Sequence, residues 1–461
     1  MIPNIADFIK GSKLFVLTHH VGFGRKLHIS FCEEMKVLEF TSIKGFKDIL
    51  PDEIAYWQQL EITARNIFRA FGFQEIRTPI LEKTELFNRG IGEETDIVSK
   101  EMYSLKDSKG KSLTLRPEAT ASVVRAYIQN RLYLKSPVQK LFTIGPMFRH
   151  ERPQKGRLRQ FHQINAELFG DSGPKSDAEM ITLAMGLFES MRLNDITLHI
   201  NSLGCDQCRE KFRDELKNYL GLRLDFLCRD CRRRAHTNPL RVFDCKIETC
   251  NQAISDAPSI LQFLCQECER HFESLQEYLN RIGISFVLDH RLVRGLDYYT
   301  KTAFEIQTGE LGAQNAIAGG GRYDGLVKLL GGPDHPAIGF AVGMERVVAL
   351  LQQKRFEADH DRPDLFIAAL GKKAEEISFD WAIKCRRDGL WIEMDYGPKG
   401  LKAQMKRAGK LNAKKVLIVG ENELFSGKAV LRNMDTKVQE EIDLNNIYDI
   451  LNRLDGGEQN C

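Results

Sequence analysis

The feature that most constrains the fold is a series of strand-like runs that follow one another closely between residues 112 and 204. These runs are SLTLRP, QKLFTIGPMFRHE, RQFHQINAELFG and ITLHINSLG, and one helical stretch, from Asp177 to Arg192, lies among them. A doubly wound parallel sheet would need a helix after every strand. The order therefore predicts an α+β domain built on a mixed or antiparallel sheet.

An amphipathic helix is predicted just before these strands, beginning at Pro51. Apolar residues recur there at spacings of three or four, which places them on one face: Ile54, Trp57, Leu60, Ala64, Ile67 and Phe71. Gly72 ends the helix, and FQEIRTPIL then indicates a strand. Sheet-like sequence returns later, in ISFVLDHRLVRGLDYYT and TAFEIQT.

Length and composition indicate a multidomain cytoplasmic protein. A chain of 461 residues exceeds one ordinary domain. Its 66 basic and 63 acidic residues leave a net charge of +3, so any polyanion site must come from local clustering. The sequence has no run of about 18 to 20 apolar residues that would form a membrane span. Residues 1–40 lack a sustained period and are expected to be an extension, and Met35 is an alternative start that would leave residues 1–34 untranslated.

A separate domain is predicted for residues 364–461. Residues 352–363, QQKRFEADHDRP, are charged and end in proline, which is typical of a linker. After them the order DLFIAAL, helix, LWIEMDY, helix, KVLIVG predicts a small α/β domain. Its second helix carries lysines four residues apart, which form either a solvated face or a phosphate-binding column: Lys402, Lys406, Lys410 and Lys414.

Eight of the 11 cysteines lie in what we expect to be an inserted, mainly helical module of about residues 205–275. Three C-x-x-C pairs and a looser fourth pair are more typical of metal ligands than of disulfides in a cytoplasmic chain. Two closed Zn²⁺ sites are predicted, one formed by Cys205, Cys208, Cys228 and Cys231, and a weaker one by Cys245, Cys250, Cys265 and Cys268. The alternative is a set of reduced structural cysteines.

The chemistry is concentrated in residues 145–170, GPMFRHERPQKGRLRQFHQINAELFG. Two strand-like arms flank a basic loop that holds Arg152, Lys155, Arg157 and Arg159. Arg149 stands on the entering arm, and Gln163 and Glu167 stand on the leaving arm. Such a hairpin can hold guanidinium groups over a polyphosphate or an RNA end. A solvated hairpin with a basic tip would show the same pattern.

Three other segments add to this chemistry. LVRGLDYYT, residues 292–300, combines Arg294 with two adjacent tyrosines. GGGRYDGL, residues 319–326, is rich enough in glycine to indicate backbone close to a ligand. GFAVGMERV, residues 339–347, predicts a strand followed at once by a helix whose first turn presents Arg346. Each pattern alone also fits ordinary core or turn structure.

Taken in order, KGFKDILP, TLRPEATA, FRHERPQKGRLRQFHQ, LVRGLDYYT, GGGRYDGL and GFAVGMERV closely resemble the histidyl-tRNA synthetases, a class II family. The resemblance covers about residues 41–461. It implies a catalytic domain at 41–351 and an anticodon-binding domain at 364–461. Motif 1 of the class corresponds to the segment around Pro51, motif 2 to the hairpin around Arg149, and motif 3 to the strand and helix around Arg346.

The resemblance also implies the reaction and the roles of individual residues. L-histidine would react with ATP, with Mg²⁺ bridging the phosphates, to give histidyl-adenylate and pyrophosphate, and histidine would then pass to its tRNA. Arg149 and Arg294 would be catalytic on the α-phosphate, and Arg149, Arg157 and Arg346 would contact ATP. The histidine site would comprise Glu118, Ala119, Thr120, Arg149, Gln163, Glu167, Arg294, Tyr298 and Tyr299. Among these, Glu118 and Thr120 would hold the α-ammonium, and Glu167 would accept a hydrogen bond from the ring.

A homodimer is expected because motif 1 lies at a subunit interface in this class. Two other functions compete with the ligase. A non-catalytic, synthetase-like regulatory subunit of histidine biosynthesis would be expected to lack the catalytic arginines and the C-terminal domain. A zinc-ribbon RNA-binding protein would explain the cysteines but none of the other motifs. The presence of Arg149, Arg294 and Arg346 favours the enzyme.

Overall fold

The computed structural model describes residues 40–92, 95–154, 156–311, 315–354, 356 and 362–447. Several predicted features lie outside the described residues: the extension before Phe40 with its alternative start at Met35, Lys155 of the basic loop, residues 355 and 357–361 of the linker, and residues 448–461. In the described ranges, no helix has both the length and the apolar character needed to cross a membrane.

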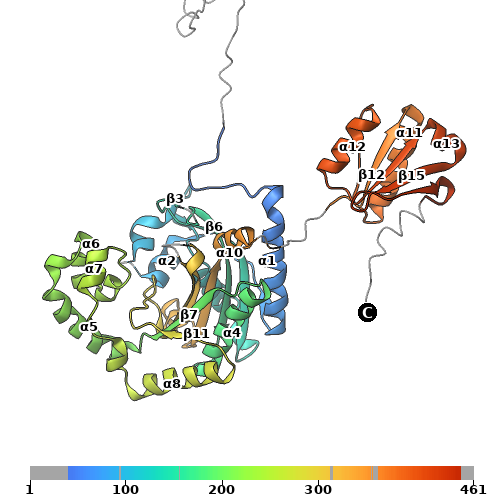
Figure 1. The fold of residues 1–461 in the computed structure, drawn as a ribbon. Coiled ribbons are helices and arrows are strands. Elements are labelled where there is room, and N and C mark those ends of the chain that lie inside the picture. Colours follow the sequence, from blue (N-terminus) through green and yellow to red (C-terminus); the bar gives the residue numbers. More distant parts are fainter. Residues whose placement is uncertain are drawn as a thin grey trace, which may run out of the picture. The chain divides into compact units, whose positions relative to one another are not determined.

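An eight-stranded sheet organises the larger part of the chain (Figure 1), with strand order β1-β5-β6-β11-β10-β9-β7-β8. The two edge pairs, β1 with β5 and β7 with β8, are parallel, and the inner pairs are antiparallel. The predicted mixed sheet of an α+β domain is thus confirmed. The strands are β1 (Gln74–Glu75), β5 (Gln139–Phe148), β6 (Gln160–Phe169), β7 (Ile196–Ser202), β8 (Val287–Leu288), β9 (Thr300–Thr308), β10 (Ala316–Arg322) and β11 (Ala337–Gly343).

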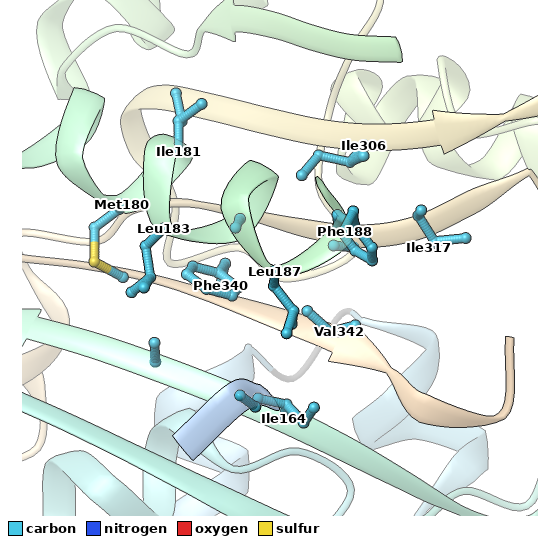
Figure 2. Close-up of a cluster of buried hydrophobic side chains, with 14 of the residues drawn as sticks. Ile164, Met180, Ile181, Leu183, Leu187, Phe188, Ile306, Ile317, Phe340 and Val342 are labelled. Atoms are coloured by element: carbon cyan, nitrogen blue, oxygen red, sulfur yellow. The ribbon is translucent and has the colours of Figure 1, made fainter. Parts of the chain in front are cut away.

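The main hydrophobic core lies between this sheet and four helices, α1 (Pro51–Ala70), α4 (Pro174–Ser190), α8 (Gln266–Arg281) and α10 (Met344–Gln353). Figure 2 shows side chains of this core, with Leu183 and Leu187 of α4 near Phe340 and Val342 of β11. The predicted apolar face of α1 packs within the chain, where Leu60 and Ala64 are fully buried. Burial of this apolar surface is the main force holding α1 and α4 on the sheet.

The opposite face of the sheet carries polar side chains. Every second residue of β6 enters the main core, from Ile164 to Leu168. Side chains alternate along a strand, so the residues between them face the other way: Gln163, Asn165 and Glu167. Their register partners on β11 are small: Gly343, Ala341 and Gly339. Small side chains on β11 leave room for ligands or long side chains above this part of the sheet.

A smaller sheet, β2 (Leu81–Lys83), β4 (Ser112–Leu115) and β3 (Tyr103–Lys106), packs with helices α2 (Thr84–Ile91) and α3 (Thr120–Gln129). The single strand predicted for FQEIRTPIL is wrong, because residues 76–80 belong to no strand and divide it into β1 and β2. Pro79 lies in this break and has no amide hydrogen to give to a ladder. The sheet-like run predicted for residues 284–300 is also mostly wrong. Residues 289–299 form a loop, called here the 289–299 loop, whose first turn is closed by Leu292 N donating to Asp289 O at 2.9 Å.

The cysteine-rich insertion is helical, as predicted. It comprises α5 (Asp206–Gly221), α6 (Arg229–Thr237), α7 (Glu248–Ala253), α8 (Gln266–Arg281) and the short helices η4 (Leu224–Phe226), η5 (Pro239–Val242) and η6 (Ile260–Phe263). It has a small hydrophobic core of its own. Helix α8 packs on α4, where His271 Nε2 lies 2.8 Å from Asp177 Oδ2. The buried Asp177 also pairs with Arg322 at the end of β10, so the last helix of the insertion is tied to the sheet.

The C-terminal domain has a five-stranded sheet of order β13-β12-β14-β15-β16. The three predicted strands and two predicted helices are present, and α13, β15 and β16 follow them. Strand β12 pairs in parallel with β13 and β14, whereas β15 is antiparallel to β14 and β16 is antiparallel to β15. The elements are β12 (Leu365–Leu370), α11 (Lys372–Arg387), β13 (Ile392–Met394), α12 (Leu401–Lys410), β14 (Lys415–Gly420), α13 (Glu421–Ser426), β15 (Lys428–Asn433) and β16 (Gln439–Asp443).

Candidate active site and cysteine clusters

A cavity of about 290 Å³ opens on the polar face of the larger sheet. Its wall is formed by the β5–β6 hairpin, the 289–299 loop, β10, β11 and the first turns of α3 and α10. It brings together most of the predicted site residues: Glu118, Thr120, Arg149, Arg157, Gln163, Arg294, Tyr298, Tyr299 and Arg346. Two predicted residues, Ala119 and Glu167, are buried next to it and are not part of its wall.

Two of the cavity's arginines, Arg149 and Arg294, are held by hydrogen bonds to neighbouring residues. Arg149 follows β5 directly, and its Nε donates to Pro117 O at 2.9 Å, while its guanidinium lies 5.3 Å from the ring centroid of Phe161. Arg294 of the 289–299 loop donates from Nη1 to Glu305 Oε2 at 2.7 Å. Burial lowers the pKa of Arg149. Burial acts in the same direction on Arg294, but the acidic groups around it, Glu305 first and then Tyr299 and Asp244, together outweigh burial and raise the pKa.

Two more arginines face the cavity from the hairpin tip and from α10. Arg346 donates from Nε to Gly156 O at 3.2 Å and from Nη1 to Ala316 O. Arg157 forms an ion pair with Glu151. Burial lowers the pKa of Arg346, and the positive charge of Arg157 lowers it further. Arginine side chains stay protonated in proteins, so the cavity concentrates positive charge as a polyphosphate site would.

A buried carboxylate stands at the start of α3. Glu118 Oε2 accepts a hydrogen bond from Thr120 N at 2.7 Å, and Oε1 accepts one from Ala121 N at 2.8 Å. Burial raises the pKa of Glu118, and these two backbone hydrogen bonds act against that rise. Because Glu118 lines a cavity rich in arginines, it offers a ligand's cationic group a defined place.

Glu167 lies beneath this wall, with both of its oxygens engaged. Oε1 accepts a hydrogen bond from Thr120 Oγ1 at 2.7 Å, and Oε2 accepts one from the hydroxyl of Tyr323. Burial raises the pKa of Glu167 to about 8. Tyr323 was not among the predicted site residues. The signal was present, because Tyr323 is the aromatic residue of the GGGRYDGL segment, but its contact with Glu167 joins strands that are distant in sequence.

Three buried polar atoms at the site indicate that a ligand belongs there. Gln163 Oε1, Asn165 Oδ1 and Arg294 Nε have no hydrogen-bond partner among the described residues. Buried polar groups are nearly always paired, so the site is expected to pair them with the groups of a bound molecule.

The glycines of β10 and β11 make room for the charged side chains of the site. A Cβ atom on Gly319 would lie 2.4 Å from Arg294 Nη2, and one on Gly339 would lie 1.7 Å from Glu167 Oε2. Only glycine fits against these groups without displacing them. The close approach of the glycine-rich segment to a ligand stays a prediction.

Comparison with known families agrees with this geometry. The family model described as Histidyl-tRNA synthetase matches residues 45–347. The chain belongs to the histidyl-tRNA synthetase family. A second model, described as an anticodon binding domain, matches residues 364–454.

Individual relatives of this family cover nearly the whole chain. A histidine–tRNA ligase of Desulfatibacillum aliphaticivorans is 56% identical over 409 residues, which are 88% of this chain and 97% of that relative. One from Geobacter sulfurreducens is 54% identical over 404 residues, 88% of this chain and 97% of that relative. The solved structure of apo histidyl-tRNA synthetase from S. aureus is 35% identical, with a TM-score of 0.76, and covers 90% of this chain and 100% of that one. The regulatory-subunit alternative is not favoured.

The eight cysteines of the insertion form two groups, within each of which the sulfur atoms lie within 4.8 Å of one another. The predicted assignment of the cysteines to two sites is wrong. The outer cluster consists of Cys205, Cys208, Cys265 and Cys268, and the inner cluster consists of Cys228, Cys231, Cys245 and Cys250. The physical reason is the path of the chain. The insertion leaves the sheet after β7 and returns to it through α8, so its first and last pairs meet at its base and the middle pairs meet inside it.

The cysteine pairs have local geometry suited to a metal ion. Cys205, Cys228 and Cys265 each stand directly before a helix, and their C-x-x-C partners lie in its first turn. Backbone amides point at the sulfurs, with Cys265 N donating to Cys208 Sγ and Cys228 N donating to Cys250 Sγ, both at 3.1 Å. Such amides stabilise thiolates, which are the form that binds metal. Either cluster could hold a tetrahedral ion through four cysteines.

Proposed function

We propose that this cavity is where the chain, a ligase of the histidyl-tRNA synthetase family, joins L-histidine to the α-phosphate of ATP and releases pyrophosphate. The histidyl-adenylate then gives its histidine to the 3′ end of the histidine tRNA. The observation that carries the proposal is the meeting of four arginines, a buried carboxylate and two tyrosines in one cavity. Labelled pyrophosphate should enter ATP only when histidine is present. Exchange at the same rate with and without histidine would contradict the proposal.

The four arginines contact different parts of the bound ATP. Arg149 and Arg294 act on the α-phosphate, because buried and already oriented donors stabilise charge that develops in the transition state. Arg157 and Arg346 contact the rest of the ATP from the hairpin tip and from α10. Mg²⁺ neutralises and orients the phosphates when it is bound, and it takes most of its ligands from phosphate and water. The carboxylates of Glu151 and Glu345 line the same cavity and fit this hard cation.

The amino-acid substrate lies between α3 and the 289–299 loop. Glu118 and Thr120 hold its α-ammonium, with Ala119 fixing the backbone between them, and Gln163 contacts its carboxylate end. Tyr298 and Tyr299 form the wall of the imidazole pocket; their exposed fractions of 9% and 7% show how little water reaches them.

Glu167 accepts a hydrogen bond from the imidazole ring in this proposal. Its oxygens already accept from Thr120 and Tyr323, but the carboxyl oxygen that carries no proton has a second lone pair and can accept again. A buried acceptor distinguishes histidine from apolar amino acids of similar size, because the wrong substrate would leave it unpaired.

The C-terminal domain binds the tRNA. Helix α12 presents three exposed lysines, Lys402, Lys406 and Lys410, on the face opposite the buried Ala408. Lys414 does not continue this column, which is a correction to the predicted set of four. The helix ends at Lys410, and Lys414 pairs instead with Asp364 at 2.6 Å. Each phosphate contact by a lysine releases counterions, so this binding weakens as salt rises.

The enzyme works as a homodimer in the cytoplasm. Support for a dimer comes from apolar residues that are exposed in and before the motif 1 helix, Phe40, Ile43, Leu50 and Ile62. Exposed apolar residues gathered in one segment mark interaction surfaces. Light scattering on the purified chain tests this, and a monomer at micromolar concentration would contradict it.

Each cysteine cluster holds one Zn²⁺ ion. A closed four-cysteine site leaves no open coordination position, so the metal takes no direct part in adenylation. Elemental analysis of protein purified without chelator should find two zinc ions per chain. Absence of zinc, with all eight thiols titrating freely in the folded protein, would show that these are reduced structural cysteines.

A further inference from the structure

We propose that the two cysteine clusters position the two ends of the segment 294–299 in the 289–299 loop, the inner cluster through Arg241 and the outer cluster through Arg209. The loop carries Arg294 at one end of its active segment and Tyr299 at the other. The kinetic test of this inference rests on the proposed function, whereas its structural test rests only on the contacts described below. Arg241 and Arg209 are positioning residues, because neither belongs to the cavity wall.

Arg241 fixes the backbone of Arg294. Its Nη1 donates to Arg294 O at 3.1 Å, and the side chain of Arg241 is only 12% exposed. The same nitrogen lies 2.7 Å from Asp244 Oδ2, so the guanidinium is held in place. Three residues further along the loop, Asp297 Oδ1 accepts a hydrogen bond from Asn238 Nδ2 at 3.1 Å. The stretch 238–244 thus contacts the loop at two points.

The inner cluster holds the stretch 238–244 in its conformation. It runs between two cysteines of that cluster, since Cys231 precedes it and Cys245 follows Asp244 directly. Val242 is 1% exposed and packs in one core with the cluster's cysteines. Its only helix, η5, is a single short turn, and a turn of this length is not stable alone. A tetrahedral metal ion would supply the constraint that its local sequence does not.

Arg209 fixes the other end of the loop. Its Nη1 donates to Tyr299 O at 2.9 Å, and it also pairs with Asp206. Arg209 follows Cys208 directly in the first turn of α5, so its place depends on the outer cluster. The two arginines therefore reach the loop from two separate cysteine clusters. One arginine holds the residue proposed to act on phosphate, and the other holds the residue proposed to contact the imidazole.

The two arginines should give different kinetic defects. Arg241→Ala should lower kcat for histidine-dependent pyrophosphate exchange roughly tenfold, with KM for histidine within about twofold, because small displacements of a catalytic group slow the reaction. Arg209→Ala should raise KM for histidine by a similar factor, with kcat little changed. Arg241→Lys should recover part of the rate, since lysine can still donate to the Arg294 carbonyl. Both alanine variants should keep the zinc content of the parent protein.

Arg232→Ala is the matched control. Arg232 lies in α6, and its hydrogen bonds go to Leu227 O and Asp225 O inside the insertion, away from the loop. Its kinetics should match the parent within twofold. Equal defects in Arg232→Ala and Arg241→Ala would overturn the inference in favour of general loosening of the insertion.

A double-mutant cycle tests the link between metal and loop. Cys250→Ser should remove one zinc ion and lower kcat as Arg241→Ala does, and the two changes together should cost little more than either alone. In the double variant of Cys250→Ser and Arg209→Ala, the fall in kcat caused by the first change and the rise in KM for histidine caused by the second should both appear in full. If the fold-decrease in kcat of the double variant equals the product of the decreases in Cys250→Ser and Arg241→Ala, the coupling is overturned. Full zinc loss without any change in kcat would also overturn it.

Hydrogen–deuterium exchange gives a readout that needs no activity. Peptides covering residues 292–299 should exchange faster in Cys250→Ser and after zinc removal, and at the parent rate in Arg232→Ala. Unchanged exchange in the zinc-free protein would overturn the inference even if the enzyme is active. If histidine-dependent pyrophosphate exchange is absent from the parent protein, the proposed function fails, and faster deuterium exchange would still support the positioning.

Discussion

Replacing Arg294 by alanine should slow adenylation far more than it weakens histidine binding. The guanidinium has one nitrogen on Glu305 at 2.7 Å, one that lies against Gly319, and a buried Nε without a partner among the described residues. At least one donor is therefore free to meet charge that develops on the ligand. The contacts proposed for the α-ammonium, at Glu118, do not depend on it.

The size of the effect follows from the number of donors lost. Loss of one preorganised donor to a developing oxyanion costs about 3 kcal/mol, or roughly a hundredfold or more in kcat. Glu305 still has a hydrogen-bond partner after the change, because its Oε1 accepts from Gln307 Nε2 at 2.8 Å. The folded state should therefore survive, and KM for histidine should stay within a few-fold of the parent value.

Pre-steady-state adenylate formation, measured at saturating histidine and ATP, checks this prediction. Arg291→Ala is the control, because Arg291 is an exposed residue of the same loop and does not line the cavity. Gly319→Ala should reproduce part of the defect, since the new Cβ would displace the Arg294 guanidinium. Near-normal adenylation by Arg294→Ala, or a rise in KM with an unchanged rate, would refute the reasoning.

Three further outcomes are expected. Neutralising Lys402, Lys406 and Lys410 should raise KM for tRNA and flatten its salt dependence while pyrophosphate exchange stays unchanged; an unaltered salt slope would mean that the column is only a solvated face. Glu118→Gln should raise KM for histidine by about 10- to 100-fold, because a charged hydrogen bond to the ammonium is lost, and an unchanged KM would remove Glu118 from the site. Burial raises the pKa of Glu167 from 4.5 to about 8, so the native state holds a proton that the unfolded chain releases, and the free energy of unfolding should fall as pH rises between these values. Urea unfolding of Glu167→Gln should lack this decline relative to the parent, and parallel pH profiles would show that Glu167 is ionised in the native state.

Most of the site could be predicted from the sequence because its residues lie in short segments with distinctive local patterns. The hairpin around Arg149, the loop around Arg294 and the helix start at Arg346 were each marked by charge or glycine beside strand-like sequence, and they line one cavity. Tyr323 was missed because its role is a contact with Glu167 across the sheet. Lys414 was wrongly added to the lysine column, because a four-residue spacing persists in the sequence after the helix itself has ended at Lys410.

The sequence by itself determined the α+β class, the helical insertion and the α/β C-terminal domain, because side-chain periodicity and chain order act locally and leave a direct trace. It also determined that the cysteines come in pairs, since the C-x-x-C spacing is set by one turn of helix. Only the tertiary structure decided which pairs meet. Cys208 and Cys265 are brought together because the insertion must leave and rejoin the same sheet, a condition on the whole chain path. The same closure sets Arg209 and Arg241 against the 289–299 loop, and no sequence pattern within either segment predicts these contacts.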